Sequence, residues 1–87
     1  MSRAYKIAVQ RTSDLRWNIW VDLDASTLLA IPGIDNVCEG ADGIRTIRID
    51  PRYDWGGILV EIMDRAGAAL SEVLTFGTWV ELEGNNA

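Results

Sequence analysis

One cysteine and no histidine limit the chemistry that this chain can perform. Cys38 is the only thiol among 87 residues. A reactive thiolate needs a neighbouring base or cation, whereas the residues around Cys38 are the acids Asp35, Glu39 and Asp42, which disfavour a thiolate. The pattern predicts an inert or half-buried cysteine and no catalytic nucleophile.

Metal binding is disfavoured for a similar reason. Tight transition-metal sites combine several thiolates and imidazoles, and this chain offers one thiol. Asp22 and Asp24, in VDLD, are expected to point the same way from one strand, about 7 Å apart. A calcium site needs six or more oxygen ligands in a shaped loop, so this pair is typical of a solvated strand end. The sequence therefore predicts no catalytic residue, no metal and no cofactor.

The four tryptophans are more informative. In RWNIWVDLD the alternation places Trp17 with the aliphatic residues of a strand, and Trp20 on the opposite side. Trp79 is likewise out of phase with the aliphatic residues of GTWVELE. If helices cover one face of a sheet, Trp20 and Trp79 project from the other face together with Arg48, and exposed tryptophans often anchor interfaces. The alternative is that both are buried within this chain, and Trp55 fits either a packed or a rim position.

Alternating apolar residues predict four strands. They lie in AYKIAVQR, RWNIWVDLD, GIRTIRID and GTWVELE, and the first two form a hairpin with a loop of about four to five residues. Between the second and third strands, ASTLLAIPG predicts one or two helical turns, capped by Asp24 or Ser26 and ended by Pro32 and Gly33. DNVCEGADG, with its two glycines, is typical of a loop.

The run at 58–74 has two interpretations. As a helix, its apolar residues form one stripe at 3.6-residue spacing, with Ile62 and Leu70 in the core. As a hairpin, it forms two strands around DRAG, and Gly67 supports this because a glycine within a helix costs about 1 kcal/mol relative to alanine. The long stripe favours the helix, with an N-terminal cap from Asp50 and Pro51 or from Asp54.

The element order predicts a single α+β domain over residues 1–83, with 84–87 as a frayed tail. LLAIPGIDNV followed by GIRTIRIDP resembles the second half of heavy-metal-associated domains, over residues 28–66. The resemblance rests on Pro32, Gly33, Asp50 and Pro51. It implies a ferredoxin-like or similar antiparallel sheet with one long and one short helix on one face, here preceded by a β-hairpin. That family holds its metal in a Cys-x-x-Cys loop where this chain has DLDAST, so no metal residue carries over.

Composition and charge narrow the function. The net charge of −5 disfavours a nucleic-acid partner, and the absence of a signal or membrane-spanning run predicts a cytoplasmic protein. We expect a non-enzymatic protein-interaction module, or a homo-oligomer, that uses Trp20, Trp79, Arg48, Asp22 and Asp24. The alternative is an acidic inhibitor or adaptor, of the virus- or mobile-element-encoded kind, that occupies a basic, nucleic-acid-binding surface of a target. A carboxylate-based enzyme and a sheet-face reader of single-stranded RNA are less favoured.

Overall fold

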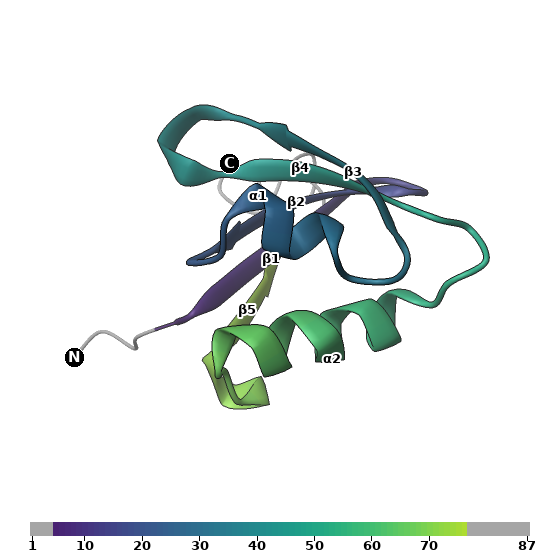
Figure 1. The fold of residues 1–87 in the computed structure, drawn as a ribbon. Coiled ribbons are helices and arrows are strands. Elements are labelled where there is room, and N and C mark those ends of the chain that lie inside the picture. The colour runs from purple at the N-terminus through teal and green to yellow at the C-terminus, as the bar shows by residue number, and fades with distance from the viewer. Residues whose placement is uncertain (1–4, 77–87) are drawn as a thin grey trace, which may run out of the picture.

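The computed structural model describes residues 5–76. These residues form five strands, two α-helices and two 3-10 turns (Figure 1). The strands are β1 Ile7–Ser13, β2 Arg16–Val21, β3 Ile34–Glu39, β4 Arg45–Ile49 and β5 Val73–Phe76. The helices are α1 Ala25–Leu29 and α2 Trp55–Ala66, and the 3-10 turns are η1 Ala41–Gly43 and η2 Leu70–Glu72. The strand predicted around Trp79 and the domain end predicted at residue 83 lie outside the described residues.

The strands form one mixed sheet in the order β3-β4-β2-β1-β5. Neighbouring strands are antiparallel except β5, which runs parallel to β1. From β2 to β5 the elements follow the strand–helix–strand–strand–helix–strand order of ferredoxin-like proteins, and β1 adds the hairpin in front. The predicted α+β fold, with one short and one long helix, is confirmed. The expected antiparallel sheet is mixed instead, because β1 lies between β2 and β5 and β5 runs parallel to it.

The core lies between the sheet and both helices. Apolar residues alternate onto the covered face of β1, β2 and β4, as their period of two predicted. Residues from α1 and α2 pack into the same cluster, so one core unites all the main elements. Its buried members are Ile7, Val9, Ile19, Val21, Leu28, Ile31, Ile34, Ile47, Ile49, Ile58 and Ile62.

Two tryptophans connect the sheet to the start of α2. Trp17 on β2 and Trp55, the first residue of α2, stack with ring centroids 3.8 Å apart and an interplanar angle of 11°. Both are partly buried against the core. The expected core position of Trp17 is confirmed, and Trp55 packs inward with it.

The β1–β2 hairpin is tighter than predicted. Only residues 14 and 15 separate the two strands, instead of the expected four to five residues. The register shifts between Arg11 and Ser13, which accommodates an irregularity near the turn. Thr12 Oγ1 donates to the Arg16 carbonyl oxygen at 3.2 Å. Thr12 and Ser13 thus extend β1 beyond the core. Their polar side chains are typical of turns, which is why the sequence predicted a longer loop.

The loop predicted at DNVCEGADG is wrong for its first half. Residues 34–39 form β3, which pairs with β4 at one edge of the sheet. A register shift between Ile34 and Asn36 breaks the alternation that identifies a strand from sequence. Ile34 is buried and Val37 is partly buried, while the other side chains of β3 are exposed. An edge strand with so few apolar residues gives a weak sequence signal.

The helix predicted over residues 58–74 is correct in type and wrong in extent. It begins at Trp55, after Asp54 Oδ2 accepts from the Gly57 amide at 3.3 Å. It ends at Ala66 because Gly67 adopts φ 64°, a left-handed conformation that commonly terminates helices. Ile62 is buried in the core as expected. Leu70, predicted to be buried, is 71% exposed because the chain has already left the helix.

Candidate functional site

The sheet face turned away from α1 and α2 carries mostly polar side chains. We call it the open face. Within residues 5–76, neither helix packs against it (Figure 1). It is defined by the residues that alternate with core positions on β1 to β4: Ala8, Gln10, Arg16, Asn18, Trp20, Asn36, Cys38, Thr46 and Arg48.

A polar row crosses the middle of the open face. Asn18 lies opposite Gln10 on one side and Thr46 on the other, and Thr46 lies opposite Cys38. Thr46 Oγ1 donates to Asn18 Oδ1 at 2.9 Å. Gln10 is only 4% exposed, and its amide Nε2 has no hydrogen-bond partner among residues 5–76. Cys38 is exposed rather than half-buried, and no general base or cation accompanies it in this row.

Trp20 stands at one end of the open face. Its side chain is 42% exposed, and its partner on β1 is the small residue Ala8. The turn before β4 approaches the ring closely: a Cβ built on Gly43 would lie 3.7 Å from Trp20 Nε1. The indole is therefore supported on one side and open on the other, as expected from its phase in the strand.

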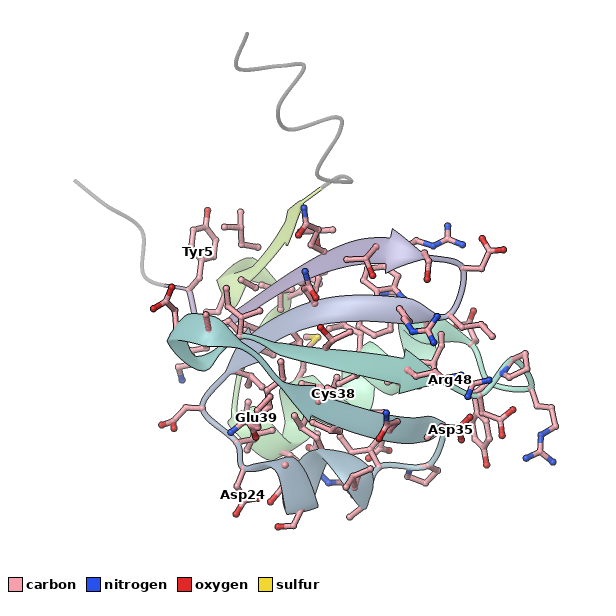
Figure 2. The ribbon with its side chains drawn as sticks, turned by 90° about the horizontal axis from the view of Figure 1, so that it is seen from above. Tyr5, Asp24, Asp35, Cys38, Glu39 and Arg48 are labelled. Atoms are coloured by element: carbon pink, nitrogen blue, oxygen red, sulfur yellow. The ribbon has the colours of Figure 1, made fainter. Side chains whose placement is uncertain are left out.

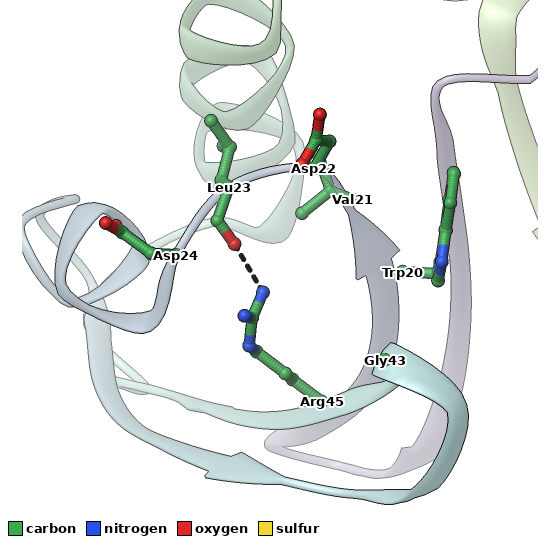
Figure 3. A pocket seen from close by; sticks show the side chains of 7 residues that line it. All are labelled: Trp20, Val21, Asp22, Leu23, Asp24, Gly43 and Arg45. Carbon is green, nitrogen blue, oxygen red and sulfur yellow. Dashed lines mark hydrogen bonds between the residues drawn. The ribbon is translucent and has the colours of Figure 1, made fainter.

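A surface hollow opens beside Trp20, where β2 ends (Figure 3). Its volume is about 440 Å³, and a neighbouring hollow of about 290 Å³ shares Trp20, Asp22 and Leu23 with it. The exposed carboxylate of Asp22 therefore borders both hollows. The first is lined by Trp20, Val21, Asp22, Leu23, Asp24, Gly43 and Arg45, and the second adds Tyr5, Lys6, Arg65 and Ala66.

Arg45 fixes the wall of the first hollow. Its Nη1 donates to the Leu23 carbonyl oxygen (Figure 3), and its Nε donates to Glu39 Oε2 at 2.9 Å. The Arg45 side chain is 18% exposed, so it is held by these contacts. The arginine, at the start of β4, therefore links the segment after β2 to the end of β3.

Asp24 caps the N-terminus of α1. The sequence had offered either Asp24 or Ser26 for this role. Its Oδ1 accepts from the Thr27 amide at 2.9 Å, from Thr27 Oγ1 at 2.5 Å and from Ser26 Oγ at 3.1 Å. These hydrogen bonds, those from Thr27 first, lower the pKa of Asp24. It is the N-cap of α1, and β2 ends at Val21. The prediction that Asp22 and Asp24 project from one strand is therefore wrong.

Two arginines occupy the other end of the open face. Arg16 and Arg48 lie directly opposite each other on β2 and β4, and like charges in such a pair repel. Among the residues that the structure describes, neither forms a salt bridge. Figure 2 shows Arg48 at the opposite end of the sheet from Asp24. Asp50 is near Arg48, but its carboxylate is bound by Arg52, with Arg52 Nη2 2.6 Å from Asp50 Oδ2.

The structure thus brings Trp20, Asp22 and Asp24 together and separates them from Arg48. Trp79 lies outside the described residues. Sequence reasoning missed Arg16, because its position opposite Arg48 depends on the pairing of β2 with β4. It also missed Gly43, which no local pattern places beside Trp20.

Comparisons of the chain with models of known families, with curated proteins and with solved structures found no match. No helix within residues 5–76 is long and apolar enough to cross a membrane. In the same range, no three potential metal-ligating side chains gather in one place. The resemblance to heavy-metal-associated domains stays a prediction.

Proposed function

We propose that this protein is a non-enzymatic protein-interaction module that binds its partner through the open face. One observation carries the proposal: Trp20 is 42% exposed on a sheet face that neither helix covers. Leaving an indole in water forgoes roughly 25 cal/mol for each Å² of apolar area. Tryptophans in such positions are common anchors of protein interfaces.

The surroundings of Trp20 support a protein partner. The polar row offers hydrogen-bonding groups, and the hollow bordered by Asp22 can accept a protruding side chain. An aromatic anchor surrounded by polar residues is the usual composition of a transient interface.

The photo-crosslinking amino acid benzoylphenylalanine tests the proposal, because at residue 20 it puts another aromatic side chain in the place of the indole. Placed at residue 20 in host cells, it should yield a protein adduct. Placed at Val60, which is 62% exposed on α2, it serves as the matched control on the helical side. A specific adduct from residue 20 alone supports the proposal. Equal yields from both positions, or none from residue 20, would contradict it.

The acidic inhibitor or adaptor is the second candidate. It is favoured by Asp22 and Asp24, which line the hollow beside Trp20. A partner with a basic surface would then bind mainly through charge, and its affinity would fall steeply with ionic strength. Trp20→Ser separates the two candidates, because it should abolish binding that is centred on the indole and should leave binding driven by Asp22 and Asp24 largely intact.

A further inference from the structure

We infer that the partner of the open face is a second copy of this chain, packed face to face with its strands antiparallel to those of the first. The inference rests on the proposed function and specifies the partner. It follows from the way charge is distributed along the open face, which makes this surface complementary to itself.

Strand β2 carries this distribution. Arg16 lies at its start, Asn18 in the middle, and Trp20 near its end, with Asp22 just beyond. At about 3.4 Å per residue, Arg16 and Trp20 are about 14 Å apart along the strand. One end of the face is therefore cationic, and the other is aromatic and acidic.

A twofold axis turns this polarity into a matched contact. If the axis lies in the plane of the face and perpendicular to the strands, β2 lies over β2 of the second copy and runs in the opposite direction. With the axis close to Ile19, Arg16 of each copy faces Trp20 and Asp22 of the other. A guanidinium group can stack on the indole and pair with the carboxylate, two favourable contacts made twice by symmetry.

The same operation relieves the repulsion between the arginines. Arg48 lies beside Arg16 without a salt bridge among the described residues. Reversal of β4 over β4 places Arg48 over the η1 turn of the second copy, which carries Asp42. Asp35 and Arg52 also lie near the Arg48 end, and their opposite charges attract each other. Because Asp35 and Arg52 neutralise each other, Arg16 and Arg48 are the cations at this end of the face that a second copy would neutralise.

The size of the face predicts a weak dimer. Four strands, each about 4.8 Å wide, and strand segments about 20 Å long give roughly 400 Å² per copy, or about 800 Å² in total, which is typical of transient contacts. Association should therefore need high protein concentration and should weaken as salt screens the paired charges.

Charge reversal on β2 provides a specific test. Sedimentation equilibrium at low salt, from about 10 µM to about 1 mM, should show the wild type dimerising. Arg16→Glu and Asp22→Lys should each weaken dimerisation at least about tenfold, because each brings like charges together. An equimolar mixture of the two variants should dimerise again, because every contact then joins opposite charges. Arg11→Glu and Asp64→Lys make the same charge changes away from the open face and should have no effect.

The inference would be overturned if the wild type stayed monomeric at about 1 mM, or if the single variants dimerised like the wild type. It would also be overturned if the mixture stayed monomeric although circular dichroism showed both variants to be folded. Crosslinking from residue 20 in mixed ¹⁵N- and ¹⁴N-labelled protein separates this failure from failure of the proposed function. A mixed-isotope adduct supports self-association. An adduct between residue 20 and residues 77–87 of the same chain overturns both self-association and the proposed function. An adduct to a different protein overturns self-association and leaves the proposed function standing.

Discussion

Gln10 is a buried amide with an unused donor, and this makes it a sensitive residue in the sheet. Within the part of the chain that the structure describes, its Nε2 lacks a partner although the residue is 4% exposed. An unsatisfied buried donor costs about 1–3 kcal/mol. Gln10→Met keeps the length of the side chain and removes that donor, so the free energy of unfolding should stay equal or rise by about 1 kcal/mol. Urea denaturation measures the change. A clear loss of stability would show that Nε2 finds an acceptor in solution.

Asp50 should give stability a specific pH dependence. Hydrogen bonds from the Arg52 side chain and from its backbone amide lower the pKa of Asp50 from 3.8 to about 2. Because the folded-state pKa lies below the unfolded one, the stabilisation is complete above pH 4 and is lost as pH falls towards 2. We expect Asp50→Asn to be less stable than the wild type at pH 7, and this gap to close between about pH 4 and 2.

Denaturant unfolding at several pH values measures that gap. Asp64→Asn, which removes one exposed charge from α2, is the matched control and should show no comparable gap at pH 7. A difference between wild type and Asp50→Asn that stays constant down to pH 2 would mean that the Asp50–Arg52 pair contributes nothing to folding.

The site residues show how far sequence can go at this scale. The exposure of Trp20 followed from its phase relative to Ile19 and Val21, which is a local property. The neighbours of Trp20 did not follow, because Gly43 reaches it only through the pairing of β2 with β4. The same pairing sets Arg16 against Arg48, and single-strand alternation holds no information about which strands are neighbours.

At the level of elements, two glycines are required for opposite reasons. Gly33 joins α1 to β3 with φ 101°, and a Cβ there would come within 2.8 Å of Tyr53 Cγ. Gly57 lies in the first turn of α2 with open space around its Cα. Gly33→Ala should therefore lower the free energy of unfolding by about 2 kcal/mol or more. Gly57→Ala should raise it by about 0.5–1 kcal/mol, because alanine is the better helix former.

Thermal or urea melts of the two variants check this pair of opposite signs. Gly33→Ala in a Tyr53→Ala background, compared with Tyr53→Ala alone, lacks the 2.8 Å contact with Tyr53 Cγ and keeps the backbone strain and the 3.0 Å contacts with Tyr53 Cβ and Ile58 Cδ1. If Gly33→Ala alone were neutral, the turn between α1 and β3 would have to be more adaptable than its geometry indicates.

The length of α2 leads to a second contrast. Ile62 is fully buried, whereas Leu70, eight residues later in the same apolar stripe, is 71% exposed. Ile62→Ala should lower the free energy of unfolding by about 2–4 kcal/mol, and Leu70→Ala should change it by less than about 0.5 kcal/mol. If both variants lost the same free energy of unfolding, the Leu70 side chain would have to be buried in the folded protein in solution.

Elements were predictable where apolar periodicity was strong. The regular alternation in β1, β2 and β4 and the stripe of α2 identified these elements correctly. β3 was missed because its register shift and its edge position leave only Ile34 and Val37 facing the core. The end of α2 was misplaced because the apolar residues continue past Gly67, and a left-handed glycine stops a helix even when apolar residues come after it.

For the whole molecule, the single core predicts that the chain unfolds in one step. The core cluster includes residues from β1, β2, β3, β4, α1 and α2, so none of these six elements has a separate core of its own. Small domains with one core usually unfold as a unit. Trp17 and Trp55 provide a local probe of this, because their stacked rings at 3.8 Å join the sheet to the start of α2.

Near-ultraviolet circular dichroism follows the asymmetric packing of these two rings, whereas the far-ultraviolet signal follows the backbone. We expect both signals, recorded during urea denaturation, to change at the same midpoint with the same slope. Trp55→Phe should remove most of the near-ultraviolet signal while leaving the far-ultraviolet transition cooperative, which assigns the signal to the pair. A near-ultraviolet transition at lower urea would show that α2 leaves the sheet before the sheet unfolds, and the one-step expectation would then be wrong.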